Sequence, residues 1–315
     1  MKYPANINDY VILKTLGNVK NRKFNTVHLV ENKHNKSKAV LKNFVKSQKS
    51  IHLQEFIRKE GNLNFESEFL PKILAFEESE TEIKFIKKYS VGIQLDEFWG
   101  KIKKKNQMLF LIEFLKKLEP IFEELRIKNL VHCDIKPSNF IIQGNPFNPT
   151  KENFEVYLID FGMAFYPSEH QNRKLIFSLA YSAPEIILNE TKLANHTSDL
   201  FSLGIMIYQL LNGKLPFSHE NPAVLTNLQL TYPIQKSNYI QEELFQIIAK
   251  MCFKTSFSKP PHLFSKEKIQ EKLIFGINKR YNSLKEINTE IAKIHFRETS
   301  FIQKLIEIFS NSKVK

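Results

Sequence analysis

One stretch of the chain constrains its fold more than any other. The sequence NLVHCDIKPSNFII at residues 129–142 places a His, an Asp, a Lys and an Asn between two apolar runs. A short polar segment of this kind is usually a turn between two buried elements. However, Asp134 and Asn139 are five positions apart with Lys136 between them, and this arrangement is used to activate a hydroxyl beside a metal-bound phosphate. One motif alone leaves both interpretations open.

A second motif makes the chemical interpretation much more specific. The sequence YLIDFGMA places Asp160 at the end of a predicted strand, 26 residues after Asp134. A carboxylate there can bind a Mg²⁺ ion that bridges phosphates, and Gly162 lets the chain turn sharply. Phosphoryl transfer needs the phosphates held by a cation and a metal, and a carboxylate at the accepting hydroxyl. Asp160 supplies a carboxylate for the metal, and Asp134 supplies the carboxylate at the accepting hydroxyl.

The first part of the chain has the pattern of strands. Residues 10–89 contain short β-rich segments separated by polar turns. One helical pattern interrupts them, with Leu53, Phe56, Ile57 and Leu63 on one side. A small, mainly β unit is therefore expected here, with one helix.

After Gly92 the pattern becomes helical. Residues 107–127 are densely apolar, and Pro120 is expected to kink or divide that helix. Residues 198–212 are apolar almost all round, which predicts a buried helix that Gly213 ends. The joint between the two parts is predicted near residues 90–92.

Composition excludes several classes of protein. Hydrophobic residues make up 42% and charged residues 25% of the 315 residues, which is typical of a globular protein. The net charge of +13 is spread along the whole chain, so a nucleic-acid partner is not favoured. No apolar stretch is long enough to cross a membrane. Two distant cysteines, Cys133 and Cys252, indicate a reducing, intracellular compartment, cytoplasmic or nuclear.

The motifs, in this order, resemble those of eukaryotic-type protein kinases from about residue 10 to about residue 290. The resemblance implies an α+β, bilobal fold with a small, mainly β N-lobe that carries one regulatory helix and a larger, mainly α C-lobe. We expect one kinase domain over residues 1–315. Its expected parts are an N-lobe at 1–89, a hinge and C-lobe at 90–295, and a helical extension at 296–315.

The resemblance also implies a nucleotide site. AVLK resembles the third-strand motif of the family, so Lys42 is expected to contact the α and β phosphates and Ala39 to cover the adenine. The glutamate that pairs with Lys42 is Glu60 or Glu55, and the separation of 18 residues favours Glu60. The other expected nucleotide contacts are Gly17, Val27, Ile141 and the hinge backbone at Lys88 and Ser90, with Lys87 in the gatekeeper position behind the adenine.

In the catalytic loop, each polar residue takes a role from the family. Asp134 is expected to orient the substrate hydroxyl and accept its proton, and Lys136 to neutralise the transferring phosphoryl group. Asn139 and Asp160 are expected to hold Mg²⁺, with Mn²⁺ as a substitute, and Ser178 to bond to Asp134. Lys136 indicates serine or threonine as the acceptor. The expected function is a serine/threonine-protein kinase that uses ATP and acts on protein substrates.

Two further markers argue for a platform that binds peptides. Glu185 in SAPE and Arg280 in NKRYNSL match an ion pair of the family, and Asp199 in DLFSLG matches an aspartate that holds the catalytic loop. Kinases that phosphorylate small molecules share the catalytic Asp and Asn but lack this Glu–Arg pair. They are the less favoured alternative.

Three departures from the family pattern are visible. Gly17 is the only glycine in LGNVKNRKFNTV, so a pseudokinase that serves as a binding or allosteric scaffold is an alternative. Cys133 stands where most members carry arginine (HCD, a non-RD loop), which predicts activity without a phosphate on the activation segment. An insertion at about 254–275 with Pro260 and Pro261 predicts a surface loop.

Overall fold

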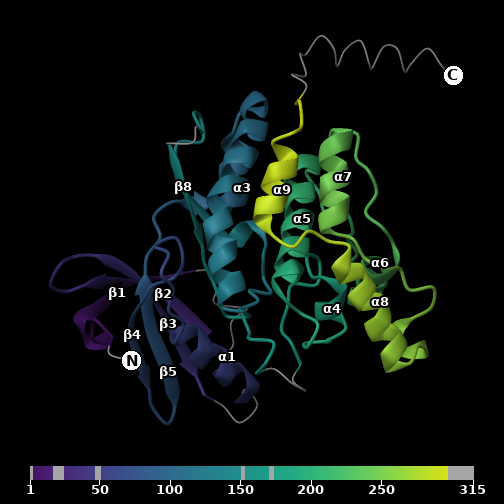
Figure 1. Cartoon of the computed structure of the whole chain (residues 1–315). Helices are drawn as coiled ribbons and strands as arrows, with labels where there is room; N and C mark the ends of the chain where they lie inside the picture. Colours follow the sequence, from purple (N-terminus) through teal and green to yellow (C-terminus); the bar gives the residue numbers. More distant parts are fainter. Residues whose placement is uncertain (1–2, 17–24, 47–50, 150–152, 170–173, 297–315) are drawn as a thin grey trace.

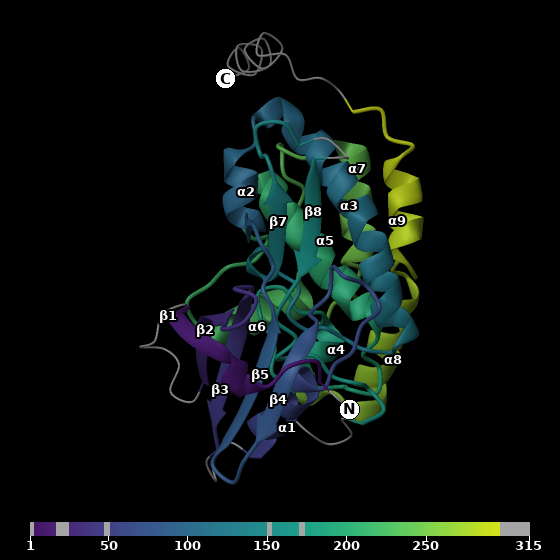
Figure 2. The same cartoon turned by 90° about the vertical axis from the view of Figure 1, so that its left-hand side faces the viewer.

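The computed structural model describes residues 3–16, 25–46, 51–149, 153–169 and 174–296. A β-sheet with one helix forms one end of the molecule, and helices form most of the remainder (Figures 1 and 2). The expected α+β, bilobal architecture is confirmed. Gly17, with the rest of the loop at 17–24, and the predicted extension from residue 297 on lie outside the described residues. The exact domain boundaries stay a prediction.

The N-terminal sheet is antiparallel throughout, with strand order β1-β2-β3-β5-β4. After a short 3₁₀ helix (Ile7–Asp9), its strands are β1 (Tyr10–Thr15), β2 (Asn25–Asn32), β3 (Lys38–Val45), β4 (Ile73–Glu78) and β5 (Glu82–Lys88). Helix α1 (Ile51–Gly61) packs against this sheet. Phe44, Ile83 and Phe85 are buried beneath it together with Ile57 of the helix.

The predicted helical pattern overshoots the end of α1. The helix ends at Gly61, and Leu63 lies beyond it although its side chain is buried. Gly61 tolerates no larger residue, because an added Cβ would lie 2.6 Å from the ring of Phe76. The backbone of α1 is therefore close to the ring of Phe76 in β4 where the helix ends.

The C-terminal part combines a small sheet with a layer of helices (Figure 2). Strands β6 (Ile93–Gln94), β7 (Phe140–Gly144) and β8 (Phe154–Leu158) form the sheet. The helices are α2 (Leu95–Lys101), α3 (Lys104–Ile127), α4 (Pro184–Ile187), α5 (His196–Asn212), α6 (Pro222–Thr231), α7 (Glu242–Met251), α8 (Lys266–Asn278) and α9 (Leu284–Ile291), with 3₁₀ turns at Pro137–Asn139 and Pro261–Leu263.

Helix α3 runs unbroken through Pro120, so the expectation that the proline divides it is wrong. Proline removes one helical N–H, whose partner would be the carbonyl of Lys116. Pro120 and Lys116 both lie on the exposed side of the helix, where water can satisfy that carbonyl. On the opposite side Phe114, Leu118 and Ile121 are fully buried, and their packing outweighs the lost bond.

Helix α5 is the predicted buried helix. Thirteen of its residues are buried, and α3, α7 and α9 stand around it in Figure 1. Asn195 caps its first turn, and Gly213 ends it with a left-handed φ of 77°.

The insertion is more ordered than the predicted surface loop. It contains α8, and Leu273 of this helix and Phe257 bury their side chains against Leu230 of α6. The adjacent prolines Pro260 and Pro261 correctly predicted an irregular start to this segment. Leu273 was too weak a hydrophobic signal to predict a packed helix after it.

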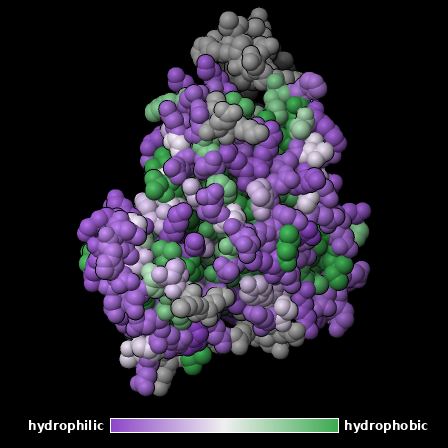
Figure 3. Space-filling model, turned by 60° about the vertical axis from the view of Figure 1, so that its left-hand side comes forward, coloured by the Kyte–Doolittle hydropathy of each residue, from purple (hydrophilic) through white to green (hydrophobic). Residues whose placement is uncertain are grey.

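The surface seen in Figure 3 is mostly hydrophilic, with hydrophobic residues in small separate patches. Within the described part of the chain, no helix is both long and apolar enough to cross a bilayer.

Candidate active site

A partly buried lysine joins the two parts of the molecule. Lys42, in the middle of β3, lies with its Nζ 2.6 Å from Glu60 Oε1 in α1 and 2.7 Å from Asp160 Oδ1. Burial opposes the charge on Lys42, but the carboxylates of Asp160 and Glu60 outweigh it and raise its pKa. In turn, the charge of Lys42 lowers the pKa of Asp160 against the effect of burial. Lys42 and Asp160 are therefore both ionised at neutral pH.

The structure decides between the two candidate glutamates. Glu60 contacts Lys42 through both of its carboxylate oxygens, and its side chain is 2% exposed. The position next to the end of α1 aims this carboxylate at β3. The family's separation of 18 residues therefore identified the partner of Lys42 correctly.

A second lysine approaches Glu60 from β5. Lys87 is buried, with its Nζ 3.8 Å from Glu60 Oε1. Burial, together with the charge of Lys42, lowers the pKa of Lys87. Lys87 pairs with Val40 in the sheet, next to Ala39 and Lys88, in agreement with the expected gatekeeper register. The family resemblance assigned this lysine to the gatekeeper position but did not predict its contact with Glu60.

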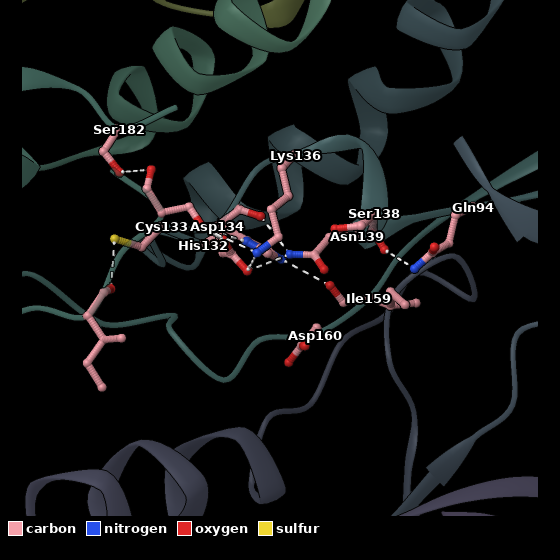
Figure 4. A network of polar contacts seen from close by, with 12 residues as sticks. Gln94, His132, Cys133, Asp134, Lys136, Ser138, Asn139, Ile159, Asp160 and Ser182 are labelled. Carbon is pink, nitrogen blue, oxygen red and sulfur yellow. Dashed lines mark hydrogen bonds and ion pairs between the residues drawn. The ribbon is translucent and has the colours of Figure 1, made fainter. Parts of the chain in front are cut away.

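The catalytic-loop residues converge on Asp134 (Figure 4). Asn139 donates from Nδ2 to Asp134 Oδ2 at 2.7 Å, and Lys136 Nζ lies 2.9 Å from the same oxygen. The hydroxyl of Ser178 donates to Asp134 Oδ1 at 2.5 Å, and Lys136 donates to Ser178 Oγ at 3.2 Å. Asp134 is thus fixed by three side chains and faces a hydroxyl.

Asp199 of helix α5 holds the catalytic loop in place. Asp199 accepts the backbone N–H groups of His132 and Cys133 at 2.8 and 3.0 Å. Burial raises the pKa of Asp199 to about 7, although these two hydrogen bonds lower it. Cys133 has a left-handed φ of 64°, which is strained for a residue with a Cβ. The hydrogen bonds to Asp199 stabilise this conformation.

His132 connects the catalytic loop to the segment around Asp160 and Phe161. It accepts from the N–H of Asp134 through Nδ1, so Nε2 carries the proton and donates to Ile159 O at 3.3 Å. Burial lowers the pKa of His132 to about 4, so the ring is neutral at pH 7. Its ring lies 4.4 Å from that of Phe161, edge to face. Phe161 is thereby held in the core, which places Asp160 toward Lys42.

The two expected metal ligands are close in the fold. The amide of Ile159 donates to Asn139 O at 2.9 Å, so Asp160 follows a residue that is tied to Asn139. The amide nitrogen of Asn139 is used by Asp134, which leaves its side-chain oxygen for a cation. One carboxylate and one amide oxygen suit Mg²⁺, which takes its remaining oxygens from phosphates and water. The residues therefore fit the implied metal.

The expected nucleotide contacts surround the same strands. Val27 pairs with Lys42 and therefore lies on the same face of the sheet. Ala39 is three residues from Lys42, so its side chain points to the opposite face, where it packs with Val30, Leu41 and Ile86, and the expectation that Ala39 covers the adenine is wrong. Lys88 is the last residue of β5, and Ser90 follows it. Ile141 pairs with Gln94, just after the hinge. Gly92 has a φ of 142°, and an added Cβ would lie 2.4 Å from Ile142 O. The hinge therefore needs glycine at this position.

Cys133 has a thiol where most members of the family have an arginine that can bind a phosphate. It contacts Ile176 O at 3.6 Å, on the segment between Phe161 and Glu185. Burial and the charges of Asp199 and Asp134 raise its pKa, so the thiol is protonated and can donate this weak hydrogen bond. A buried, protonated thiol is also poorly reactive.

The predicted pair of Glu185 and Arg280 is formed. The two guanidinium nitrogens of Arg280 lie 2.5 and 3.0 Å from the two carboxylate oxygens, and both side chains are almost fully buried. Ser198 donates to the same carboxylate. The guanidinium also stacks 4.9 Å from the ring centre of Phe201 in the DLFSLG motif. This cluster anchors the segment that follows Ser178.

The fold and these contacts define a protein kinase domain. The chain matches the protein kinase domain family over residues 10–271. Because this match covers most of the 315 residues, the chain belongs to the protein kinase family.

Particular relatives are serine/threonine kinases. Serine/threonine-protein kinase ATG1 of Pichia angusta is 32% identical over 180 residues, which is 48% of this chain and 22% of the relative. The ATG1 kinase of Debaryomyces hansenii is 37% identical over 146 residues (42% and 16%). Human serine/threonine-protein kinase D2 is 32% identical over 128 residues (39% and 14%). The chain therefore covers less than a quarter of the length of each of these relatives.

Proposed function

We propose that this chain is an active serine/threonine-protein kinase that transfers the γ-phosphate of ATP to protein substrates. The observation that carries the proposal is the joint placement of Lys42, Glu60 and Asp160 beside Asp134 and Asn139. A scaffold has no chemical need for all of these groups in mutual contact. The names of the relatives support a serine/threonine acceptor.

The residues divide the work of phosphoryl transfer. Asp134 orients the hydroxyl of the substrate and takes up its proton, while Lys136 stabilises the negative charge that develops on the phosphoryl group. Lys42, held by Glu60, positions the phosphates. Asp160 and Asn139 hold the metal, and when bound the Mg²⁺–ATP complex supplies an activated phosphoryl group.

The surroundings of Asp134 favour a peptide over a small-molecule acceptor. The hydroxyl of Ser178 lies 2.5 Å from Asp134, next to the position that the hydroxyl of a substrate would take. The buried pair of Glu185 and Arg280 fixes the segment that follows Ser178. This segment provides a rigid edge along which an extended peptide can lie. Cys133 and Cys252 are both buried free thiols, which supports a reducing compartment.

The test is transfer of radiolabelled phosphate from ATP to a degenerate peptide library with fixed serine, threonine or tyrosine. Wild-type protein is expected to label the serine and threonine peptides in the presence of Mg²⁺ or Mn²⁺. Asp160→Asn, which removes the metal-binding charge, is expected to lower transfer at least a hundredfold. The control Asp96→Asn, in the exposed first turn of α2, is expected to match wild type. Equal labelling by wild type and Asp160→Asn would favour a pseudokinase.

A further inference from the structure

The segment after Ser178 is the natural place for a peptide substrate. Because Ser178 contacts Asp134, a peptide whose hydroxyl reaches Asp134 must lie next to Ser178. Its neighbouring residues then pass Leu179 and Ala180. Both of these residues are only partly buried, so part of each faces solvent beside Ser178.

Gln229 of α6 holds this backbone in place. Its side chain donates from Nε2 to Ala180 O at 2.6 Å and to Leu179 O at 3.3 Å. Gln229 is fully buried, and no partner of its Oε1 is found among the described residues. The two donated bonds are thus the polar contacts that fix this amide.

Lys254 in turn holds Gln229. Its Nζ donates to the main-chain oxygen of Gln229 and stands 4.5 Å from the ring centre of Phe217. The adjacent Phe253 carbonyl accepts from Arg280 Nε at 2.9 Å. Lys254 therefore links α6 to the buried ion pair that fixes the far end of the same segment.

The inserted segment makes this arrangement rigid. Phe257 and Leu273 pack against Leu230, the neighbour of Gln229 in α6. Gln270 of α8 also donates to Glu190 Oε2 at 2.9 Å, just after α4. The insertion thus packs against both α6 and the region that follows Glu185, where sequence reasoning expected only a surface loop.

We propose that Gln229 and Lys254 are positioning residues for the peptide substrate. They fix the carbonyl groups of Leu179 and Ala180 and so determine which side chain is accepted beside the phosphorylated residue. Neither residue contacts the nucleotide site residues described above. The inference rests on the proposed kinase activity and assigns part of its substrate selectivity to α6 and the insertion.

The test compares Lys254→Met with wild type, because methionine keeps the apolar stem and removes the donor. The KM for the best library peptide is expected to rise about tenfold, with kcat and the KM for ATP within about twofold. Selectivity is expected to weaken only at positions that flank the acceptor. Gln229→Leu, which removes both donated bonds, is expected to give the same pattern. Lys254→Arg keeps a donor and is expected to restore selectivity.

The matched control is Lys272→Met in α8. Lys272 also donates to a backbone oxygen, that of Ser256, and lies near the ring of Phe257. Its removal is expected to leave the KM for the peptide unchanged. Amide hydrogen exchange at residues 179–181 gives a readout without activity and is expected to speed up in Lys254→Met but not in Lys272→Met.

Two results would overturn the proposal. One is that Lys254→Met and Gln229→Leu both keep the wild-type KM for the peptide, the wild-type selectivity and the wild-type rate of hydrogen exchange. The other is an equal rise in the KM values for peptide and ATP, which would report a general loss of structure. A wild-type protein that labels no peptide would instead contradict the proposed function itself.

Discussion

At the residue scale, the centre of the site is a balanced set of charges. Lys42 and Lys87 face Glu60 and Asp160, and Lys87 is the member that the catalytic mechanism does not require. The sequence predicted Lys42, Asp134, Asn139 and Asp160 because each lies at a fixed spacing within a motif. The contact of Lys87 with Glu60 depends on how β5 packs against α1, and no local pattern encodes it.

Lys87→Met is expected to stabilise the fold. The lowered pKa of Lys87 shows that its surroundings disfavour its charge, and methionine fills a similar volume without that charge, so the free energy of unfolding is expected to rise by about 1 kcal/mol at pH 7. Because the pKa of Lys87 is lowered in the folded state, the unfolded chain binds more protons between that pKa and the ordinary value of 10.5. Wild-type stability therefore rises with pH across this range, and the advantage of the variant shrinks.

Urea unfolding at several pH values measures this difference. Lys38→Met, an exposed substitution on β3, serves as the control and is expected to change stability by less than about 0.5 kcal/mol at every pH. A Lys87→Met protein that is less stable than wild type at pH 7 would show that Lys87 is needed to neutralise Glu60.

At the element scale, the structure departs from the sequence pattern in two helices. Pro120 was expected to interrupt α3, but it lies on the exposed side of a helix that is buried on the other. The insertion was expected to be a loop, but α8 packs through Leu273. In both cases packing against distant elements decides the local structure, and a short sequence window does not contain that information.

The segment between Asp160 and Glu185 carries a prediction about regulation. The thiol of Cys133 contacts Ile176 O directly, whereas an arginine at this position would pair with a phosphorylated residue of the segment. We therefore expect Ser168→Ala, an exposed substitution on this segment, to retain peptide phosphorylation within about twofold. Wild-type protein treated with phosphatase is expected to behave in the same way. Loss of activity in either sample would mean that a phosphate on this segment is required.

At the scale of the whole molecule, the pair of Glu185 and Arg280 joins residues 95 positions apart. Arg280→Met would leave Glu185 charged, buried and without its main partner, at a cost of about 3–5 kcal/mol in the free energy of unfolding. The double variant Glu185→Gln with Arg280→Met removes both charges and is expected to lose less.

Urea unfolding of the single and double variants checks this prediction, with the exposed Lys279→Met as a control for loss of a positive charge. The family motifs predicted the pair correctly. The supporting contacts from Ser198 and Phe201 follow only from the packing of α5 against both partners. An additive result, in which the double variant loses as much as the two single variants together, would contradict a direct coupling.

The most direct test of the central claim is a crystal structure with a non-hydrolysable ATP analogue and Mg²⁺. The account predicts a triphosphate between Lys42 and Asp160, with the metal on Asp160 and Asn139 and the γ-phosphate beside Asp134. An analogue bound elsewhere, or one whose phosphates lie away from Lys42 and Asp160, would contradict it.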